Sequence, residues 1–386
     1  MKRRFFWVLP VFIALFIWAC SSDSSDDPGT DDVTGGMDDD VAPAMFDRGA
    51  MLTNWADNII IPAYTSFSSE LTELNTAFDA FSANRTVDNL VAFRQAWLDA
   101  YIAWQRVSMF ETGPAETVGY RLNMNTYPTD TVLLESFVAS GSYDLSLPSN
   151  RDVKGFPALD YLLNGLETDD IALVSRFDTD SDATNRLAYI SDILDDMIAL
   201  TDQVLQEWEG SFRNSFVSND GSSATASTDR FVNDFIFYYE KFLRAGKMGI
   251  PLGVFTGTTA PNTIEAFYKA DVSRTLFLTG LDAVQDFFNG EHFDSSATGE
   301  SLASYLRFLN EIKDGVALDQ VINDQFDLAA EMVNGLDTFR NEIENNSPPT
   351  DMLMAYDEVQ RAVPLLKVDM VSAMSISIDF VDADGD

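Results

Sequence analysis

Apolar residues recur at helical spacing along most of the chain. Between Arg186 and Trp208 they return every three or four positions with acidic residues between them, which is the pattern of an amphipathic helix. Thr86–Phe110 and Phe231–Ala245 repeat this pattern with aromatic residues on the apolar face. The same reasoning predicts further helices over Asn262–Phe288, Ser301–Lys313, Ala317–Asn345 and Met352–Met374.

Capping residues and helix breakers suggest where these helices end. Asn262 is a predicted N-cap with Glu265 as its reciprocal partner, and Gly290 is expected to close the same helix. Gly246 lies near the expected end of the preceding helix, and Pro364 predicts a kink in the last one. Loops are expected at 140–152, 168–185, 218–227 and 346–349.

Strand patterns are scarce, since only Ser375–Val381 alternates apolar and polar residues. The predicted fold class is therefore all-α. So many long helices exceed one four-helix core, and we expect two packed helical-bundle domains, over 43–220 and 221–386.

The first residues are typical of an export signal. Basic residues at positions 2–4 precede an apolar stretch that is too short to span a bilayer and contains Pro10. We expect a signal peptide over 1–19 and lipidation of Cys20, which resembles a lipoprotein cleavage site; an ordinary secretory signal is the alternative. Residues 20–42 are predicted to be the lipidated Cys and a disordered acidic tether. The acidic run also resembles a surface-export signal of lipoproteins, and a charged spacer without such a signal is the alternative. The expected location is the bacterial outer membrane, on its periplasmic face or at the cell surface, with the lipid anchor as the contact to the membrane.

Composition limits the chemistry. The chain has 386 residues with 24 Lys and Arg against 62 Asp and Glu, a net charge of −38 that disfavours nucleic acid as a partner. One Cys and one His exclude a disulfide scaffold, an iron–sulfur cluster and three-histidine zinc. The single histidine, His292, follows a predicted helix end and favours a surface role.

Several stretches resemble the imelysin-like family of bacterial envelope proteins. They occur in the family's order and are Trp97–Arg121, Lys154–Gly165, 237–253, 260–273 and 367–386. This resemblance implies two helical-bundle domains with a site at their interface. It also implies either peptidase activity, as described for founding members, or a link to iron uptake.

The resemblance is incomplete at the family's hallmark, Gly-x-His-x-x-Glu. The corresponding stretch here is Gly155–Asp160, in which Pro157 occupies the histidine position and Asp160 the glutamate position. Proline neither ligates a metal nor accepts a proton as imidazole does. Functions that need the histidine–glutamate pair are therefore in doubt.

The residues proposed to form a ligand site are Asp160, Arg121, Glu111, Trp104, Glu240 and Glu265. Asp160 is the predicted metal ligand, and an oxygen-ligated metal such as iron or calcium would suit these acids. Each residue also has a structural interpretation: Glu265 as a capping partner, Arg121 as a neutralising cation, and Trp104 as part of an aromatic core rather than of a haem pocket. The terminal residues 382–386 begin like a calcium loop but stop before its distal glutamate.

Three functional hypotheses follow. The first is a non-catalytic lipoprotein that binds iron or an iron-containing ligand between its bundles. The second is a surface protein whose ancestral site has decayed, and the third is a metallopeptidase of the imelysin type.

Overall fold

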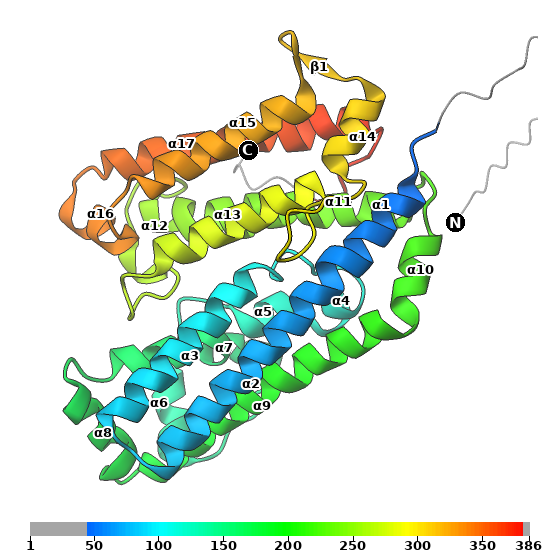
Figure 1. The fold of residues 1–386 in the computed structure, drawn as a ribbon. Coiled ribbons are helices and arrows are strands. Elements are labelled where there is room, and N and C mark those ends of the chain that lie inside the picture. Colours follow the sequence, from blue (N-terminus) through cyan, green and yellow to red (C-terminus); the bar gives the residue numbers. More distant parts are fainter. Residues whose placement is uncertain (1–44, 381–386) are drawn as a thin grey trace, which may run out of the picture. The chain divides into compact units, whose positions relative to one another are not determined.

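Helices make up nearly all of the regular structure in the computed structural model, which describes residues 45–380 (Figure 1). The strands found within this range are β1 (Ile312–Lys313) and β2 (Val316–Ala317), which form a small antiparallel hairpin. The all-α prediction is confirmed. The predicted signal peptide, Cys20, the predicted acidic tether and the terminal residues 382–386 lie outside the described range.

The first group of helices is built on α2 (Ile61–Ala83), which packs against both α3 (Val87–Gln105) and α9 (Ala183–Glu207). Thr86 begins α3 by accepting the backbone N–H of Asn89 at 3.2 Å through its hydroxyl. Shorter helices complete the group: α1 (Arg48–Asn54), α4 (Pro114–Val118), α5 (Tyr120–Met124), α6 (Thr131–Ser140), α7 (Gly155–Asp160), α8 (Asp170–Asp178) and α10 (Arg213–Ser218).

The second group is built on α15 (Leu318–Asn334), which packs against α13 (Ser273–Asn289) and α17 (Thr350–Pro364). Its first helix, α11 (Ser227–Phe237), continues through a π-helical segment, Tyr238–Gly249, that packs on both α13 and α17. The remaining helices are α12 (Ile250–Leu252), α14 (Leu302–Leu309), α16 (Phe339–Asn345) and α18 (Val371–Ala373).

The two groups meet where α13 packs against α3. The Phe287 ring lies 4.8 Å from Trp55, 5.7 Å from Phe110 and 4.9 Å from Phe231, so aromatic side chains from both groups share one core. The loop 219–226 joins the groups at the position where the sequence suggests a domain boundary. The division into domains 43–220 and 221–386 stays a prediction.

Two predicted helix ends near the junction are wrong. The chain over 262–272 is mostly irregular and α13 begins only at Ser273, because the Glu265 side chain is buried in an ion pair instead of capping a helix. Gly246 does not end its helix either: helical structure runs on to Leu252, and Gly253 at φ +72° closes it. The predicted closure of α13 by Gly290 is confirmed.

Other boundaries differ in the same way. Ala317–Asn345 is two helices, because Thr338 caps a new one after Gly335. The predicted helix over Ser301–Lys313 ends at Leu309 and leads into β1, and the expected loop at 168–185 contains α8. The described part of the alternating stretch at the C-terminal end, 375–380, forms no strand. Pro364 lies where α17 passes directly into the π-helical segment Leu365–Met370, and the kink expected there stays a prediction.

Candidate functional site

Arg121 is the centre of the largest cluster of predicted site residues. Its guanidinium is almost fully buried, and its Nε donates to the carbonyl of Ser108 at 2.7 Å while Nη2 donates to that of Met109 at 3.2 Å. Nη2 also lies 3.2 Å from Asp234 Oδ1, on α11. The arginine therefore links the chain after α3 to the second group of helices.

Glu111 belongs to the same cluster. Its Oε2 accepts the backbone N–H of Arg121 at 2.8 Å, and its own N–H donates to Asp234 Oδ2 at 2.9 Å. Burial raises the pKa of Glu111 to about 7, although the Arg121 charge opposes this shift. A carboxyl group that titrates near neutrality thus lies beside a fixed cation.

A cavity of about 330 Å³ opens onto this cluster and is called the outer cavity here. Both groups of helices contribute to it, and its lining includes Glu111, Arg121, Asp234, Phe242 and Phe380. An ion pair between Arg230 and Glu116, at 2.7 Å, adds opposite charges to its wall. The outer cavity thus combines charged groups with aromatic surface, and its lining is more polar than that of a typical small-molecule site.

A second cluster lies next to it and contains Glu265. The Glu265 carboxylate is 1% exposed, forms an ion pair with Lys247, and accepts from Asn125 Nδ2 at 2.8 Å and Gln105 Nε2 at 3.3 Å. Lys247 also donates to Gln105 Oε1 at 2.8 Å. Glu265 therefore has its partners within the protein.

A smaller space, the inner cavity, lies beside this ion pair. Its lining is Trp104, Gln105, Ser108, Arg121, Asn125, Tyr127, Tyr238, Phe242 and Lys247. Arg121 and Phe242 line both cavities, with the Arg121 guanidinium 4.6 Å from the centre of the Phe242 ring. The two cavities therefore meet at this pair.

Asp160 ends α7 and joins the two groups of helices. Its carboxylate accepts the backbone N–H groups of Tyr268 at 2.8 Å and Lys269 at 2.9 Å, and Asn164 Nδ2 at 3.1 Å. Burial raises the pKa of Asp160 to about 7 against the effect of these hydrogen bonds. In the described range, no three His, Cys, Asp or Glu side chains are placed to hold one metal ion. Asp160 acts here as a hydrogen-bond acceptor that joins the two groups of helices. The described residues place no further ligands beside it for the predicted metal ion.

Glu240 lies apart from both cavities. Its carboxylate is fully buried and accepts from Lys367 Nζ at 2.8 Å, with Arg244 Nη2 at 3.8 Å. The aromatic residues around Trp104 pack as a core: the Tyr101 and Phe156 rings stack 4.4 Å apart. The stretch around Gly155–Asp160 thus approaches α3, but it does not bring Asp160 to the other acids.

Asp234 and Lys247 are the site residues that sequence reasoning missed. Asp234 lies three residues after Phe231 and four before Tyr238, so a charged group is placed on the apolar face of a helix. Lys247 follows the buried Leu243 by four residues in the same way. A charge at core spacing is the signal that points to both residues.

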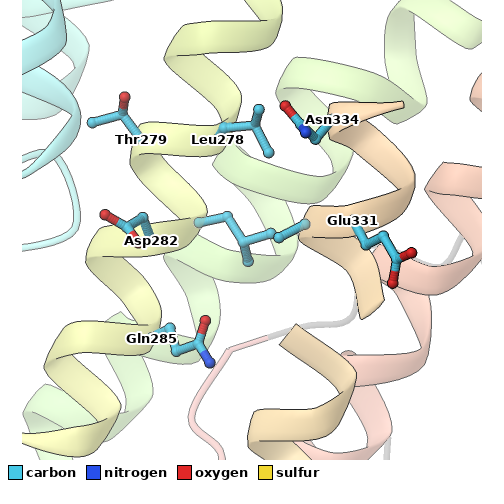
Figure 2. Close-up of a pocket in the computed structure, with 8 residues that line it drawn as sticks. Leu278, Thr279, Asp282, Gln285, Glu331 and Asn334 are labelled. Atoms are coloured by element: carbon cyan, nitrogen blue, oxygen red, sulfur yellow. The ribbon is translucent and has the colours of Figure 1, made fainter. Parts of the chain in front are cut away.

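Figure 2 shows a larger hollow, of about 450 Å³, between α13 and α15. Polar side chains of Asp282, Gln285, Glu331 and Asn334 surround it together with Leu278, and none of the predicted site residues lines it. Gln285 is already engaged, donating to Asp327 at 2.8 Å. The outer and inner cavities, with their buried cations, are the better candidate.

A family comparison agrees with this architecture. The imelysin family model, named as a peptidase family, matches residues 60–363. The chain belongs to the imelysin family. Part of the chain, 30% of its length, is 32% identical over 120 residues to iron-regulated protein A of Synechococcus elongatus, and the match spans about a third of that relative.

Two crystal structures share the imelysin fold with this chain. A candidate iron-regulated protein A precursor from Parabacteroides distasonis has a TM-score of 0.67 at 17% identity, covering 84% of this chain and 95% of that one. An imelysin-like protein from Psychrobacter arcticum has a TM-score of 0.65 at 16% identity, covering 86% and 97%. At these identities the likeness shows the fold alone.

Proposed function

We propose that this imelysin family member is a non-catalytic lipoprotein of the outer membrane, anchored through Cys20, that binds an iron-containing ligand in the outer cavity. The observation that carries the proposal is the Arg121–Glu111–Asp234 cluster, buried where the two groups of helices meet and open to a cavity of about 330 Å³. The name of the Synechococcus relative, iron-regulated protein A, supports iron as the metal in the ligand.

The oxygen atoms available at the site favour an iron chelate over a bare iron or calcium ion. Ferric iron and calcium prefer several oxygen ligands, and the described residues offer no group of three acids around one point. Asp234 is already paired with Arg121, and the Asp160 oxygens accept backbone N–H groups. An iron compound that carries its own ligands, with an anionic part for Arg121 and an apolar part for Phe242 and Phe380, fits these walls better.

Attachment to the membrane would come from the lipid on Cys20. Within the described residues, every helix is too short or too polar to cross a bilayer. Acyl chains on the N-terminal cysteine would hold the protein at the membrane by burying methylene groups. Metabolic labelling with a palmitate analogue tests this part: the wild-type protein takes up label and Cys20→Ser does not.

Calorimetric titration of the purified protein tests the binding. We expect ferric citrate or haemin to bind saturably, while calcium chloride gives no saturable heat. Saturable binding of calcium, with no response to either iron compound, would overturn the proposal.

A protease assay tests the peptidase alternative. The histidine that the family motif supplies is replaced by Pro157, which lines a separate cavity with Asp160. We expect no turnover of casein over a long time course, with or without a chelator. Chelator-sensitive cleavage by the wild-type protein would replace the binding function with a catalytic one.

A further inference from the structure

Two residues that line the inner cavity carry hydrogen-bond donors with no acceptor among the described residues. Trp104 is 1% exposed, and its indole Nε1 finds no hydrogen-bond partner in the described part of the chain. Arg121 uses Nε and Nη2 for its hydrogen bonds, while Nη1 makes none to the described residues. A buried donor without a partner costs free energy unless something in the cavity accepts from it.

Lys247 adds a third donor to the same space. Its Nζ carries three protons, of which Gln105 and Glu265 take two. One proton of the ammonium group is therefore left for an occupant of the cavity.

Three acceptor atoms of the lining are already in use, and the Tyr127 hydroxyl, which can both donate and accept, is a further polar group there. Gln105 Oε1 accepts from Lys247, Asn125 Oδ1 accepts from the Tyr101 hydroxyl at 2.5 Å, and the Tyr238 hydroxyl accepts from Ser108 at 2.8 Å. The inner cavity therefore offers more donors than acceptors.

Size and hydrogen bonding together indicate the occupant. The inner cavity has a volume of about 20 Å³, which is room for one water molecule or one ion of similar radius. Water accepts about two hydrogen bonds and must itself donate two, whereas an anion accepts from every donor and needs no acceptor. Glu265 pairs with Lys247 and Asp234 pairs with Arg121, so these cations leave no excess positive charge and a monovalent anion is favoured over one of higher charge.

We propose that the inner cavity binds one small monovalent anion, held by Trp104 Nε1, Arg121 and Lys247. A free halide and the carboxylate oxygen of a ligand in the outer cavity are two sources of this chemistry, since Arg121 and Phe242 line both cavities. The anion site does not depend on the iron ligand, so each proposal stands or fails without the other.

Bromide anomalous diffraction tests the site directly. We expect crystals of the wild-type protein soaked in sodium bromide to show an anomalous peak among Trp104, Arg121 and Lys247. Trp104→Phe keeps an aromatic ring but removes the N–H, and its peak should fall to less than half. Trp55→Phe is the matched control, because Trp55 Nε1 is equally buried and unpartnered but lies outside the cavity, against Phe231 and Phe287.

The other outcomes of the bromide experiment would overturn the proposal. Ordered water without anomalous signal in the wild-type cavity overturns the proposal, and a peak that is unchanged in Trp104→Phe marks an adventitious ion only. In solution, replacing gluconate with bromide at constant ionic strength should raise the unfolding temperature of the wild-type and Trp55→Phe proteins but not of Trp104→Phe. Equal shifts of the unfolding temperature in all three proteins would contradict the proposed anion site.

A competition experiment separates the two sources. If formate, a lone carboxylate, lowers the bromide peak at equal ionic strength, the site accepts carboxylate oxygen. If the peak is unaffected, the site is a halide site.

Discussion

Asp160 accepts the backbone N–H of Tyr268 at 2.8 Å, although 108 residues separate the two in sequence. This hydrogen bond and its neighbour from Lys269 tie α7, in the first group of helices, to the irregular segment before α13. The aspartate in the glutamate position of the family motif is thus used to join the two halves of the fold.

Replacing Asp160 tests this connection. Asp160→Asn turns one acceptor oxygen into an NH₂ group facing a backbone N–H, and we expect the free energy of unfolding in urea to fall by about 1–3 kcal/mol. Asp170→Asn is the control, because its ion pair with Arg94 is 41% exposed on the aspartate side and worth about 0–1 kcal/mol. Equal losses in both variants would contradict the connecting role.

Gly155 is required where α7 begins. It has φ +69°, and a Cβ atom there would lie 2.2 Å from the carbonyl oxygen of Met124. Gly155→Ala should destabilise the protein by about 3–5 kcal/mol, measured by chemical unfolding.

Gly315 provides the matched comparison. It also has positive φ, +85°, but a Cβ atom at that position would have nothing within 4 Å. Gly315→Ala should therefore cost only the strain of the left-handed backbone, about 1–2 kcal/mol. If both substitutions lower the free energy of unfolding equally, the close approach of the Met124 carbonyl oxygen to Gly155 does not contribute to the loss.

Local pattern predicts the long helices because their buried faces follow one period. α3, α9 and α17 lie where the apolar spacing indicates, and Thr86 and Gly290 act at the ends expected of them. The pattern misses α8 because the helix has only 9 residues and the exposed Ile171 interrupts the spacing of its two buried residues, Leu173 and Phe177.

The candidate site depends on distant contacts. Glu265 resembles a capping residue because Asn262 precedes it by three positions, but its ion pair with Lys247 and bonds from Gln105 and Asn125 determine its position. Arg121 and Glu111 are expected from the family resemblance, whereas their partner Asp234 requires the packing of α11 against the first group. No local pattern encodes such pairings.

The ion pair between Arg121 and Asp234 should show strong coupling. Arg121→Met leaves Asp234 largely buried without its cation, and we expect a loss of about 3–5 kcal/mol. Adding Asp234→Asn should restore part of this loss, so the double variant is more stable than Arg121→Met alone. Additive losses in thermal unfolding would show that the two side chains act independently.

Glu111 should make stability depend on pH. Its pKa is raised from 4.5 to about 7 in the folded state, so between those values the folded protein holds more protons than the unfolded one. Stability contributed by this group therefore falls as pH rises from about 4.5 to 7 and levels off above. The raised pKa of Asp160, also about 7, acts with the same sign.

Glu111→Gln keeps an acceptor for the Arg121 N–H but removes the titration. Urea unfolding between pH 5 and 8 should show a shallower decline for this variant than for the wild type. Glu116→Gln, at an exposed carboxylate in the same cavity wall, should keep the wild-type slope. A wild-type slope in Glu111→Gln would mean that its carboxyl does not titrate in this range.

Equilibrium dialysis against radioactive ferric citrate tests the central claim most directly, with Arg121→Lys as the test variant and Arg94→Lys as its control. Both arginines donate to a backbone carbonyl and to an aspartate, but only Arg121 lines the cavities. We predict saturable retention of about one iron per chain in the wild type and in Arg94→Lys, and at least about tenfold weaker retention in Arg121→Lys, because lysine cannot reproduce the planar fork of arginine. Equal retention by all three proteins, or none above background in the wild type, would contradict the account.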